Sequence, residues 1–511
     1  MMARVPRLLA NAAVARPSLT VAAIFLGAVL TTLQGRLFSA ALPDLRGQFG
    51  LDVLEAAWLG TALNGAQLLT MPVVPWLALT IGPARVLCIP SLVLGAATLA
   101  IPFCAHHYPA LVALHLLAGL CLGVYLPLTV SLALRSVRPG LWLLVMAAYS
   151  LRVSTGMDAG MGVSAWFVEE LDWRWIYWTA AGAGPLIALL VWKAVPMAPV
   201  DQDGLSRTDW GGMALFCGGL GLIFLGVEPA ERLGWMDSGL VASSLAGGLI
   251  LFGAAVLRAA RHPSLFGALA PLGNRNIRIC LAIACLFGVL MTPTSLLIPA
   301  FLGLMGGLKP MQTGTAALIA FAAYLACTPL AVFLGRRIEP RLLIMAGLIV
   351  IALVARMGAQ LSHDWRVEQF VGILILQSVG ECIMLIGLIA AFVTNLNPVH
   401  AAALGAYVPV ARVLTPVLAG TAMTAWLRIA GDLSRASLDL HVQAGSPLAI
   451  ERAGAGLAQL AQVLARESPV IAYIDGFNLV FWTSLTALLL AMGLRSSPPN
   501  PIVPPFAAPV S

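Results

Sequence analysis

Seven ionisable side chains lie inside long apolar segments of the sequence, where charged residues are rare. They are Arg36, His115, Arg152, Asp158, Arg356, Glu381 and Arg412. An Arg or Asp at the centre of a bilayer costs about 2.5–3.5 kcal/mol on insertion scales, so residues of this kind normally face a cavity or a partner. Arg356 stands near the end of its segment, and we expect its head group to extend to the membrane surface.

The two acids in this set, Asp158 and Glu381, are the candidates for proton coupling. Burial in an apolar medium favours the protonated form of a carboxyl group, whereas a nearby guanidinium favours the charged form. A movement of an Arg toward or away from the acid would therefore release or bind a proton. The alternative is a permanent Arg–carboxylate pair that locks two helices together. His115 is a third candidate because an imidazole titrates near neutral pH, and hydrogen-bonded packing is its alternative role.

Further polar side chains of these segments are candidates for contact with a substrate in a central cavity. Counting the seven ionisable residues with His neutral, there are four positive and two negative charges. A net-positive cavity would favour anionic or neutral amphipathic substrates over lipophilic cations. Hydrogen bonding between helices is the alternative for the arginines. The candidates are Arg36, Arg152, Arg412, Gln34, Asn64 and Gln67.

The composition requires a membrane around these residues. Of the 511 residues, 60% are hydrophobic and 10% are charged, whereas a soluble globular protein carries about 25% charged residues. Basic residues are dispersed rather than gathered in a stripe, which excludes nucleic-acid binding. The cysteines never form a CxxC pair, which argues against a zinc site or a disulfide framework. Neither Lys193 nor Lys309 follows a glycine, so a phosphate-binding loop is excluded. We expect no enzyme activity, no cofactor and no metal.

Windows of about 20 apolar residues, the length that crosses a hydrocarbon core, predict fourteen transmembrane helices. For the first one a signal peptide is the alternative, because Arg4, Arg7 and Arg16 precede it. Sixteen Lys and Arg fall in connections on the side of the N-terminus and five in the others, which predicts that both termini are cytoplasmic. The expected starts are near Thr20, Ala56, Arg85, Tyr108, Gly140, Trp173, Trp210, Asp237, Arg278, Met311, Arg341, Arg366, Ala401 and Val470.

The predicted fold is an all-α polytopic membrane protein with two six-helix bundles and two extra helices between them. Leu457, Leu460 and Leu464 stand at helical spacing in the longest connection and predict an amphipathic surface helix there. The expected parts are a cytoplasmic N-terminus (1–19), an N-terminal bundle (20–195), two linking helices with a cytoplasmic loop (196–277), a C-terminal bundle (278–495) with a long periplasmic loop (431–469), and a disordered Pro-rich tail (496–511).

A weak internal repeat supports two related halves. Arg152-Val153-Ser154-Thr155 and Arg412-Val413-Leu414-Thr415 stand mid-way along the fifth helix of each predicted bundle. Secondary transporters are often built from such repeats.

Short motifs mark the ends and the middle of several expected helices. They are Ala41-Leu42-Pro43-Asp44-Leu45, Trp173-Arg174-Trp175-Ile176-Tyr177, Asp209-Trp210-Gly211-Gly212, Trp235-Met236-Asp237-Ser238 and Gly156-Met157-Asp158-Ala159-Gly160. With these motifs the chain resembles, over nearly its whole length, the fourteen-helix drug:proton antiporter family of the major facilitator superfamily. The resemblance implies a central cavity and alternating access driven by a proton gradient.

The chain also departs from that family. Gln34 stands where the first helix usually carries an acid, His115 stands where an Arg is usual, and the cytoplasmic gating motif is reduced to Gly82 and Arg85. These departures bear on the family's usual cationic-drug specificity and usual proton site. Gly156 and Gly160 keep the small-xxx-small spacing that lets helices approach closely, with flexing during transport as the alternative role.

From this resemblance we expect a proton-coupled secondary active transporter that exports small amphipathic compounds. The alternatives are a membrane-embedded sensor or enzyme that does not transport, and a facilitator that is not coupled to protons. The expected partners are a small-molecule substrate, protons, the lipid bilayer and a periplasmic adaptor protein, which members of this family often use. The expected location is the cytoplasmic membrane of a bacterium.

Overall fold

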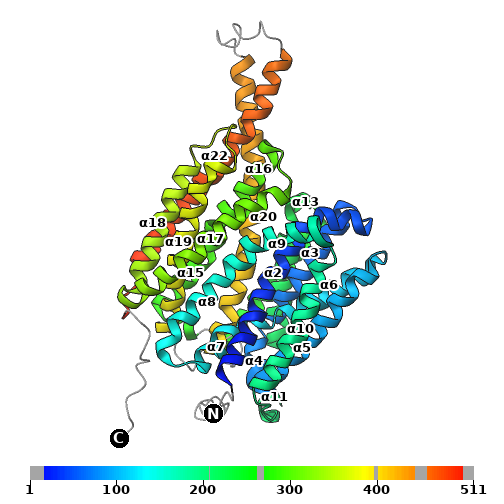
Figure 1. Cartoon of the computed structure of the whole chain (residues 1–511), viewed down its shortest axis with the longest axis vertical. Coiled ribbons are helices and arrows are strands. Elements are labelled where there is room, and N and C mark those ends of the chain that lie inside the picture. The colour runs from blue at the N-terminus through cyan, green and yellow to red at the C-terminus, as the bar shows by residue number, and fades with distance from the viewer. Residues whose placement is uncertain (1–15, 207, 262–269, 396–400, 444–456, 499–511) are drawn as a thin grey trace.

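In a bilayer every backbone N–H and C=O must find a partner inside the protein, and this chain meets that requirement with helices. The computed structural model describes residues 16–206, 208–261, 270–395, 401–443 and 457–498, and every regular element within these ranges is helical. Figure 1 shows long helices running side by side, with one pair projecting far beyond the others. The predicted all-α architecture is confirmed.

The N-terminal bundle buries an apolar core of its own, built from α2 and the helices around it. Its helices are α2 (Pro17–Phe49), α3 (Val53–Thr70), α4 (Val74–Thr80), α5 (Pro83–Ala100), α6 (Tyr108–Leu122), α7 (Tyr125–Ser136), α8 (Trp142–Ser154), α9 (Gly160–Trp166) and α10 (Trp175–Ala194). Between α8 and α9 the helix widens into a π-helical turn, Thr155–Ala159. Such widened turns are frequent at functional sites.

The linking helices and the C-terminal bundle follow. The short α11 (Gln202–Ser206) leads to the pair α12 (Trp210–Val227) and α14 (Gly239–Arg261), which the short α13 (Ala230–Leu233) connects. The C-terminal bundle consists of α15 (Arg275–Leu290), α16 (Ile298–Gly306), α17 (Pro310–Arg337), α18 (Pro340–Gly358), α19 (Val367–Asn395), α20 (Ala401–Gln443) and α22 (Leu457–Met492). Two further π-helical turns are Phe167–Leu171, which follows α9, and Pro293–Leu297, which stands before α16.

The number of spans in the described residues is close to the predicted fourteen. Twelve helices are long and apolar enough to cross a membrane, and the bent pair α3 and α4 raises the number to thirteen. The expected fifth span is the helical run Trp142–Leu171, which this count leaves out. It carries Arg152 and Asp158 in its middle and is accordingly less apolar. Fourteen helices therefore fit the architecture, although only thirteen satisfy the criterion of length and hydropathy.

The two bundles meet along the fifth span and α17. The hydroxyl groups of Ser150 and Tyr324 share a hydrogen bond of 2.5 Å across this seam. Near the other end of the seam a Cβ on Gly314 would lie 3.2 Å from the Cα of Gly162, so two glycines allow the backbones to touch. The seam is therefore packed along much of its length.

The long connection expected as a loop, 431–469, is largely helical. Helix α20 continues to Gln443 and α22 begins at Leu457, so the two form the projecting hairpin of Figure 1. The hydroxyl of Ser468 donates to the carbonyl of Gly431 at 2.7 Å and joins the two helices at the base of the hairpin. Neither 432–443 nor 457–468 contains a Gly or Pro, so nothing in these segments ends the helices. Residues 444–456 lie outside the described ranges.

The chain ends at the opposite face of the bundle from the hairpin. We call that face the terminal end, because α2 begins there and α22 ends there, and we call the other face the hairpin end (Figure 1). Ser496, expected to be part of a disordered tail, donates to Glu339 at 2.9 Å, and Ser497 accepts from Asn395 at 3.3 Å. The tail from 499 onward and the N-terminal residues 1–15 lie outside the described ranges.

Gly156 is the residue that lets the π-helical turn contact α2. A Cβ at this position would lie 2.3 Å from the Cβ of Thr32 and 2.9 Å from its backbone carbon. A Cβ on Gly160, one turn later, would lie 3.2 Å from the Cβ of Arg36. The predicted packing role of this glycine pair thus has a specific partner, α2.

We predict that Gly156→Ala destabilises the protein by about 1–3 kcal/mol, the usual cost of overpacking a filled core. The added methyl group has no room, because backbone as well as side-chain atoms of Thr32 occupy the space. The thermal unfolding midpoint of the purified protein measures the effect. Gly182→Ala is the matched control, since nothing lies within 4 Å of a Cβ there. Equal midpoints for the two variants would contradict the prediction.

Candidate functional site

The side chain of Arg36 extends from the middle of α2 to the place where the two bundles meet. Its Nε donates to the carbonyl of Met157 at 3.2 Å, in the π-helical turn of the N-terminal bundle. Its Nη2 lies 3.4 Å from the carbonyl of Ser295, in the π-helical turn of the C-terminal bundle. One guanidinium thus contacts both halves of the protein.

Asp158 is the acidic neighbour of Arg36. Its carboxylate is 8% exposed, accepts a hydrogen bond from the hydroxyl of Ser154, and attracts Arg36 electrostatically. Arg36 and Asp158 come from helices more than one hundred residues apart in sequence. The structure therefore joins two candidates to which the sequence assigned separate roles.

Glu381 brings the second acid to the same region from α19. It is 4% exposed and close enough to Asp158 for the two carboxyl groups to repel each other when charged. Gln377, one turn before it, donates to Glu381 Oε1 at 2.7 Å and to the carbonyl of Leu290 at 2.8 Å. We call Arg36, Asp158 and Glu381 the central charge cluster.

Gln377 was not among the residues singled out from the sequence. It is fully buried, and its Oε1 has no hydrogen-bond partner among the described residues. The signal for it was present, because Gln377 and Glu381 are four residues apart on one apolar helix and hence on one face. Its amide orients the Glu381 carboxyl group toward α15.

Arg152 contacts α2 near the cluster. Its Nη1 donates to the hydroxyl of Thr32 at 2.6 Å, and its guanidinium lies 4.6 Å from the centre of the Tyr149 ring. The side chain is 4% exposed. This geometry agrees with the alternative of hydrogen bonding between helices. Arg412, its counterpart in the repeat, lies in α20, but its side chain is outside the described part of the structure.

His115 and Gln34 lie elsewhere in the N-terminal bundle. The Nδ1 of His115 is 2.7 Å from the carbonyl of Leu111, and its Nε2 is 3.1 Å from the hydroxyl of Tyr177. A carbonyl can only accept, so Nδ1 carries the proton and Nε2 accepts from the tyrosine. Gln34 donates to the carbonyl of Ile176 on α10 at 2.8 Å. Both side chains therefore hold the N-terminal bundle together.

The remaining candidates lie in α3 and in the first turn of α5. Asn64 is half-buried beside α2, where its Oδ1 would lie 3.6 Å from a Cβ on Gly35, and Gln67 is buried at 4% exposure. At the terminal end Arg85 donates to the carbonyls of Ile81 and Ala198, at 2.8 and 2.6 Å.

Gly82 and Arg356 both stand at helix ends. Gly82, before α5, has φ +90°, a left-handed conformation that favours glycine. Arg356 is exposed at the end of α18, 5.9 Å from the centre of the Phe481 ring, as expected for a residue that extends to the surface.

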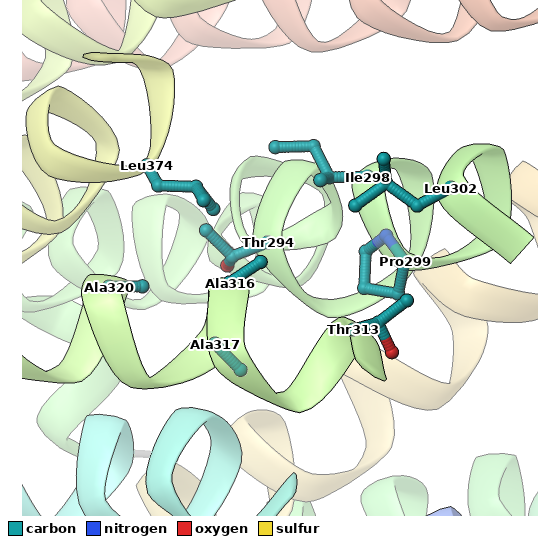
Figure 2. A pocket seen from close by; sticks show the side chains of 9 residues that line it. All are labelled: Thr294, Ile298, Pro299, Leu302, Thr313, Ala316, Ala317, Ala320 and Leu374. Atoms are coloured by element: carbon teal, nitrogen blue, oxygen red, sulfur yellow. The ribbon is translucent and has the colours of Figure 1, made fainter. Parts of the chain in front are cut away.

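A small cavity lies beside the C-terminal contact of Arg36. A cavity of about 10 Å³ adjoins the Ser295 turn, which is room for about one water molecule. Figure 2 shows its lining, from the π-helical turn Pro293–Leu297 and α16, from α17, and from Leu374 of α19. Thr294 and Thr313 are the polar residues of this lining. A molecule larger than water could enter this cavity only if the helices that line it moved apart.

At the hairpin end a group of ion pairs connects the linking helices to both bundles. Arg428 of α20 and Glu231 of α13 form an ion pair, with 2.5 Å between Nε and Oε1. The indole of Trp235 donates a hydrogen bond to the same carboxylate at 2.7 Å. The adjacent pair of Arg232 and Glu228 is joined at 2.9 Å and shares hydrogen bonds with Thr61 of α3.

Comparison with known proteins gives the relatives of this chain. A family model described as "Major Facilitator Superfamily" matches residues 24–308. The fatty acid resistance protein FarB of Neisseria gonorrhoeae is 22% identical over 394 residues, which cover 77% of this chain and 76% of FarB. The multidrug export protein EmrB of Haemophilus influenzae is 22% identical over 223 residues, 42% of each chain. The solved proton:xylose symporter XylE has a TM-score of 0.56 at 10% identity, covering 94% of this chain and 96% of XylE.

We predict that the Glu231–Arg428 ion pair stabilises the protein in a pH-dependent way. The hydrogen bond from Arg428 lowers the pKa of Glu231, against the smaller opposite effect of burial. An acid whose pKa is lowered on folding stabilises the protein above its ordinary pKa, about 4.3 for Glu, and loses that contribution as the pH falls through the lowered value. The thermal midpoint of the wild type should exceed that of Glu231→Gln at neutral pH.

This difference should shrink as the pH is lowered through the acidic range. Glu368→Gln, at an exposed position on α19, is the control and should show no such pH-dependent difference. A difference between wild type and Glu231→Gln that stays constant with pH would contradict the prediction.

Proposed function

The chain belongs to the Major Facilitator Superfamily, and from this premise we propose that it exports small amphipathic compounds in exchange for protons, by alternating access. The family and the helical spans make it a multi-pass membrane transporter. The observation that carries the proposal is the central charge cluster. It joins Arg36 and Asp158 of one bundle to Glu381 of the other, at the seam that must open and close.

The cluster supports proton coupling because its charges depend on the contact between the bundles. When the bundles separate, Arg36 loses its contact with Ser295, and Glu381 moves relative to Asp158. Each of these changes alters the electrostatic cost of a charged carboxylate in a medium of low dielectric constant. A proton is then bound in one state and released in the other, which is the requirement for coupled transport.

Export and the amphipathic nature of the substrate are supported by the relatives. FarB is named for fatty acid resistance and EmrB for multidrug export. Both names describe the removal of molecules that combine apolar and polar parts. A site of charged side chains among apolar helices suits such molecules.

We further propose that the hairpin end faces away from the cytoplasm. The excess of Lys and Arg lies in the connections at the terminal end, and such an excess marks the cytoplasmic side. Both termini are then cytoplasmic, in the inner membrane of a bacterium, and the hairpin of α20 and α22 extends toward the side where a periplasmic adaptor would bind.

The test uses the purified full-length protein in liposomes with an imposed pH gradient and an internal pH indicator. We expect an amphiphile that is transported to dissipate the gradient in the wild type. Asp158→Asn or Glu381→Gln should abolish this substrate-dependent proton flux, because neither amide binds a proton in this pH range. Anionic, neutral and cationic amphiphiles are compared.

Glu368→Gln is the matched control, since it removes an exposed acid from the same helix as Glu381. It should keep the wild-type flux. Movement of substrate without proton flux would identify a facilitator instead. Binding without movement would identify a sensor, and either result would overturn the proposal.

A further inference from the structure

Three arginines from three elements gather around the last turn of α22. Nη2 of Arg341, in the first turn of α18, donates to the carbonyl of Met492 at 2.9 Å. Nη2 of Arg275, the first residue of α15, would lie 3.6 Å from a Cβ on the next residue, Gly493. Arg495 follows directly after this turn. Three arginines that are far apart in sequence thus share the place where α22 ends.

The side chain of Asn276 fixes the backbone of Arg495 beside α15. Its Oδ1 accepts a hydrogen bond from the backbone N–H of Arg495 at 2.9 Å, and its Nδ2 donates to the carbonyl of the same residue at 3.3 Å. Asn276 is 5% exposed and stands next to Arg275 in the chain. Because a buried amide holds both polar groups of this backbone unit, the position of Arg495 is part of the fold.

These arginines lack the acidic partner that another arginine at the terminal end has. Arg258 of α14 pairs with Asp209 at 2.9 Å. Within the described ranges Arg275, Arg341 and Arg495 form no ion pair. In addition, Nε of Arg341 is buried and has no hydrogen-bond partner among the described residues. The positive charge of this group is therefore not compensated by the part of the protein that the structure describes.

The acid beside the group, Glu339, has a different partner. Its carboxylate accepts a hydrogen bond from the hydroxyl of Ser496 at 2.9 Å. One carboxylate against three guanidinium groups leaves an excess of two positive charges, and Arg278, exposed one turn after Arg275, adds another. The forked N–H donors of arginine suit the oxygens of a phosphate. Helices α15 and α18 both begin here, and the positive ends of their dipoles also favour an anion.

The helix faces that lead away from the arginines are apolar. Helices α18 and α22 pack against each other, and each exposes large apolar side chains that are spaced along one side of the helix. These residues are Leu342, Ile349 and Leu353 of α18, and Trp482, Leu489 and Met492 of α22. Both series begin at the arginines, because Leu342 follows Arg341 and the carbonyl of Met492 is bonded to it. A positively charged group thus continues into an apolar surface.

We propose that Arg275, Arg341 and Arg495, which we call the arginine triad, bind the head group of an anionic phospholipid, whose acyl chains lie along the exposed faces of α18 and α22. Basic pockets between membrane helices bind anionic head groups in this way. The ends of spans lie at a membrane surface, where the head groups are, whichever side the terminal end faces. The inference therefore depends on the membrane fold and not on what the protein transports.

The experiment measures lipid binding by the full-length protein, purified in an uncharged detergent and freed of native lipid. Native mass spectrometry counts the bound molecules as phosphatidylglycerol is added. Phosphatidylethanolamine with the same acyl chains is the comparison, since its head group contains a phosphate but has no net charge. We expect one tightly bound phosphatidylglycerol per protein. Phosphatidylethanolamine should bind about tenfold more weakly, because its ammonium group is repelled by the excess of positive charge.

The variants separate lipid binding from general damage. Arg275→Gln and Arg495→Gln change exposed side chains, so neither should lower the thermal unfolding midpoint of the lipid-free protein. Each should weaken phosphatidylglycerol binding about fivefold, the effect of one basic residue near an anionic lipid surface. Arg341→Gln should weaken it at least as much. Arg366→Gln is the matched control, because it removes an exposed arginine beside the start of α19 at the hairpin end, and it should bind like the wild type.

A site for a soluble anion would give a different result. Glycerol 1-phosphate has a phosphate without acyl chains, so it should displace phosphatidylglycerol only in large excess. Displacement at equal concentration would identify a soluble phosphate as the ligand and overturn the inference. Equal binding of the two lipids, or unchanged phosphatidylglycerol binding in all three variants of the triad, would overturn it as well. Lipid binding that requires the triad, in a protein without substrate-dependent proton flux, would keep the inference and reject the proposed function.

Discussion

A guanidinium in the middle of a membrane protein has to be compensated by charge or by hydrogen bonds, and the placement of Arg36 depends on this requirement. Its partners come from two segments that are distant in sequence: Met157 and Asp158 in the π-helical turn Thr155–Ala159, and Ser295 in the π-helical turn Pro293–Leu297. The turns and helices that meet at Arg36 are also the elements at the seam of the two bundles. The electrostatic environment of one half-buried side chain therefore depends on the contact between the two halves.

The backbone around the cluster is shaped for this close contact. The π-helical turn Thr155–Ala159 brings Met157 and Asp158 to α2, and Gly156 and Gly160 remove the side chains that would hold the helices apart. Along the seam, Gly162 and Gly314 allow a further approach, and Ser150 and Tyr324 share a hydrogen bond. Packed seams of this kind have discrete closed and open arrangements, because a filled interior does not deform continuously.

Different interactions connect the elements at the two ends of the molecule. At the hairpin end, the partly exposed ion pair of Glu231 with Arg428 connects the linking helices to the C-terminal bundle. At the terminal end, Arg85 and the residues around Asn276 and Asn395 form hydrogen bonds to backbone carbonyls and amide side chains. Ion pairs near the surface are weak individually, so they separate at little energetic cost.

Much of this protein follows from its sequence because the membrane imposes strict rules. Apolar runs of the right length become helices, and the few ionisable residues in them stand out, so the architecture and the members of the central charge cluster were predicted. The cluster's partnerships were not predictable, since Arg36 and Met157 are 121 positions apart and meet only where two helices cross. Gln377 and the extension of α20 to Gln443 were missed for a related reason, whereas the leucine spacing predicted a helix where α22 begins. A polar residue gains its role from what it faces, and a polar segment becomes a helix when a neighbouring span continues into it. Composition and periodicity decided what crosses the membrane, and the packing of helices decided which charges meet.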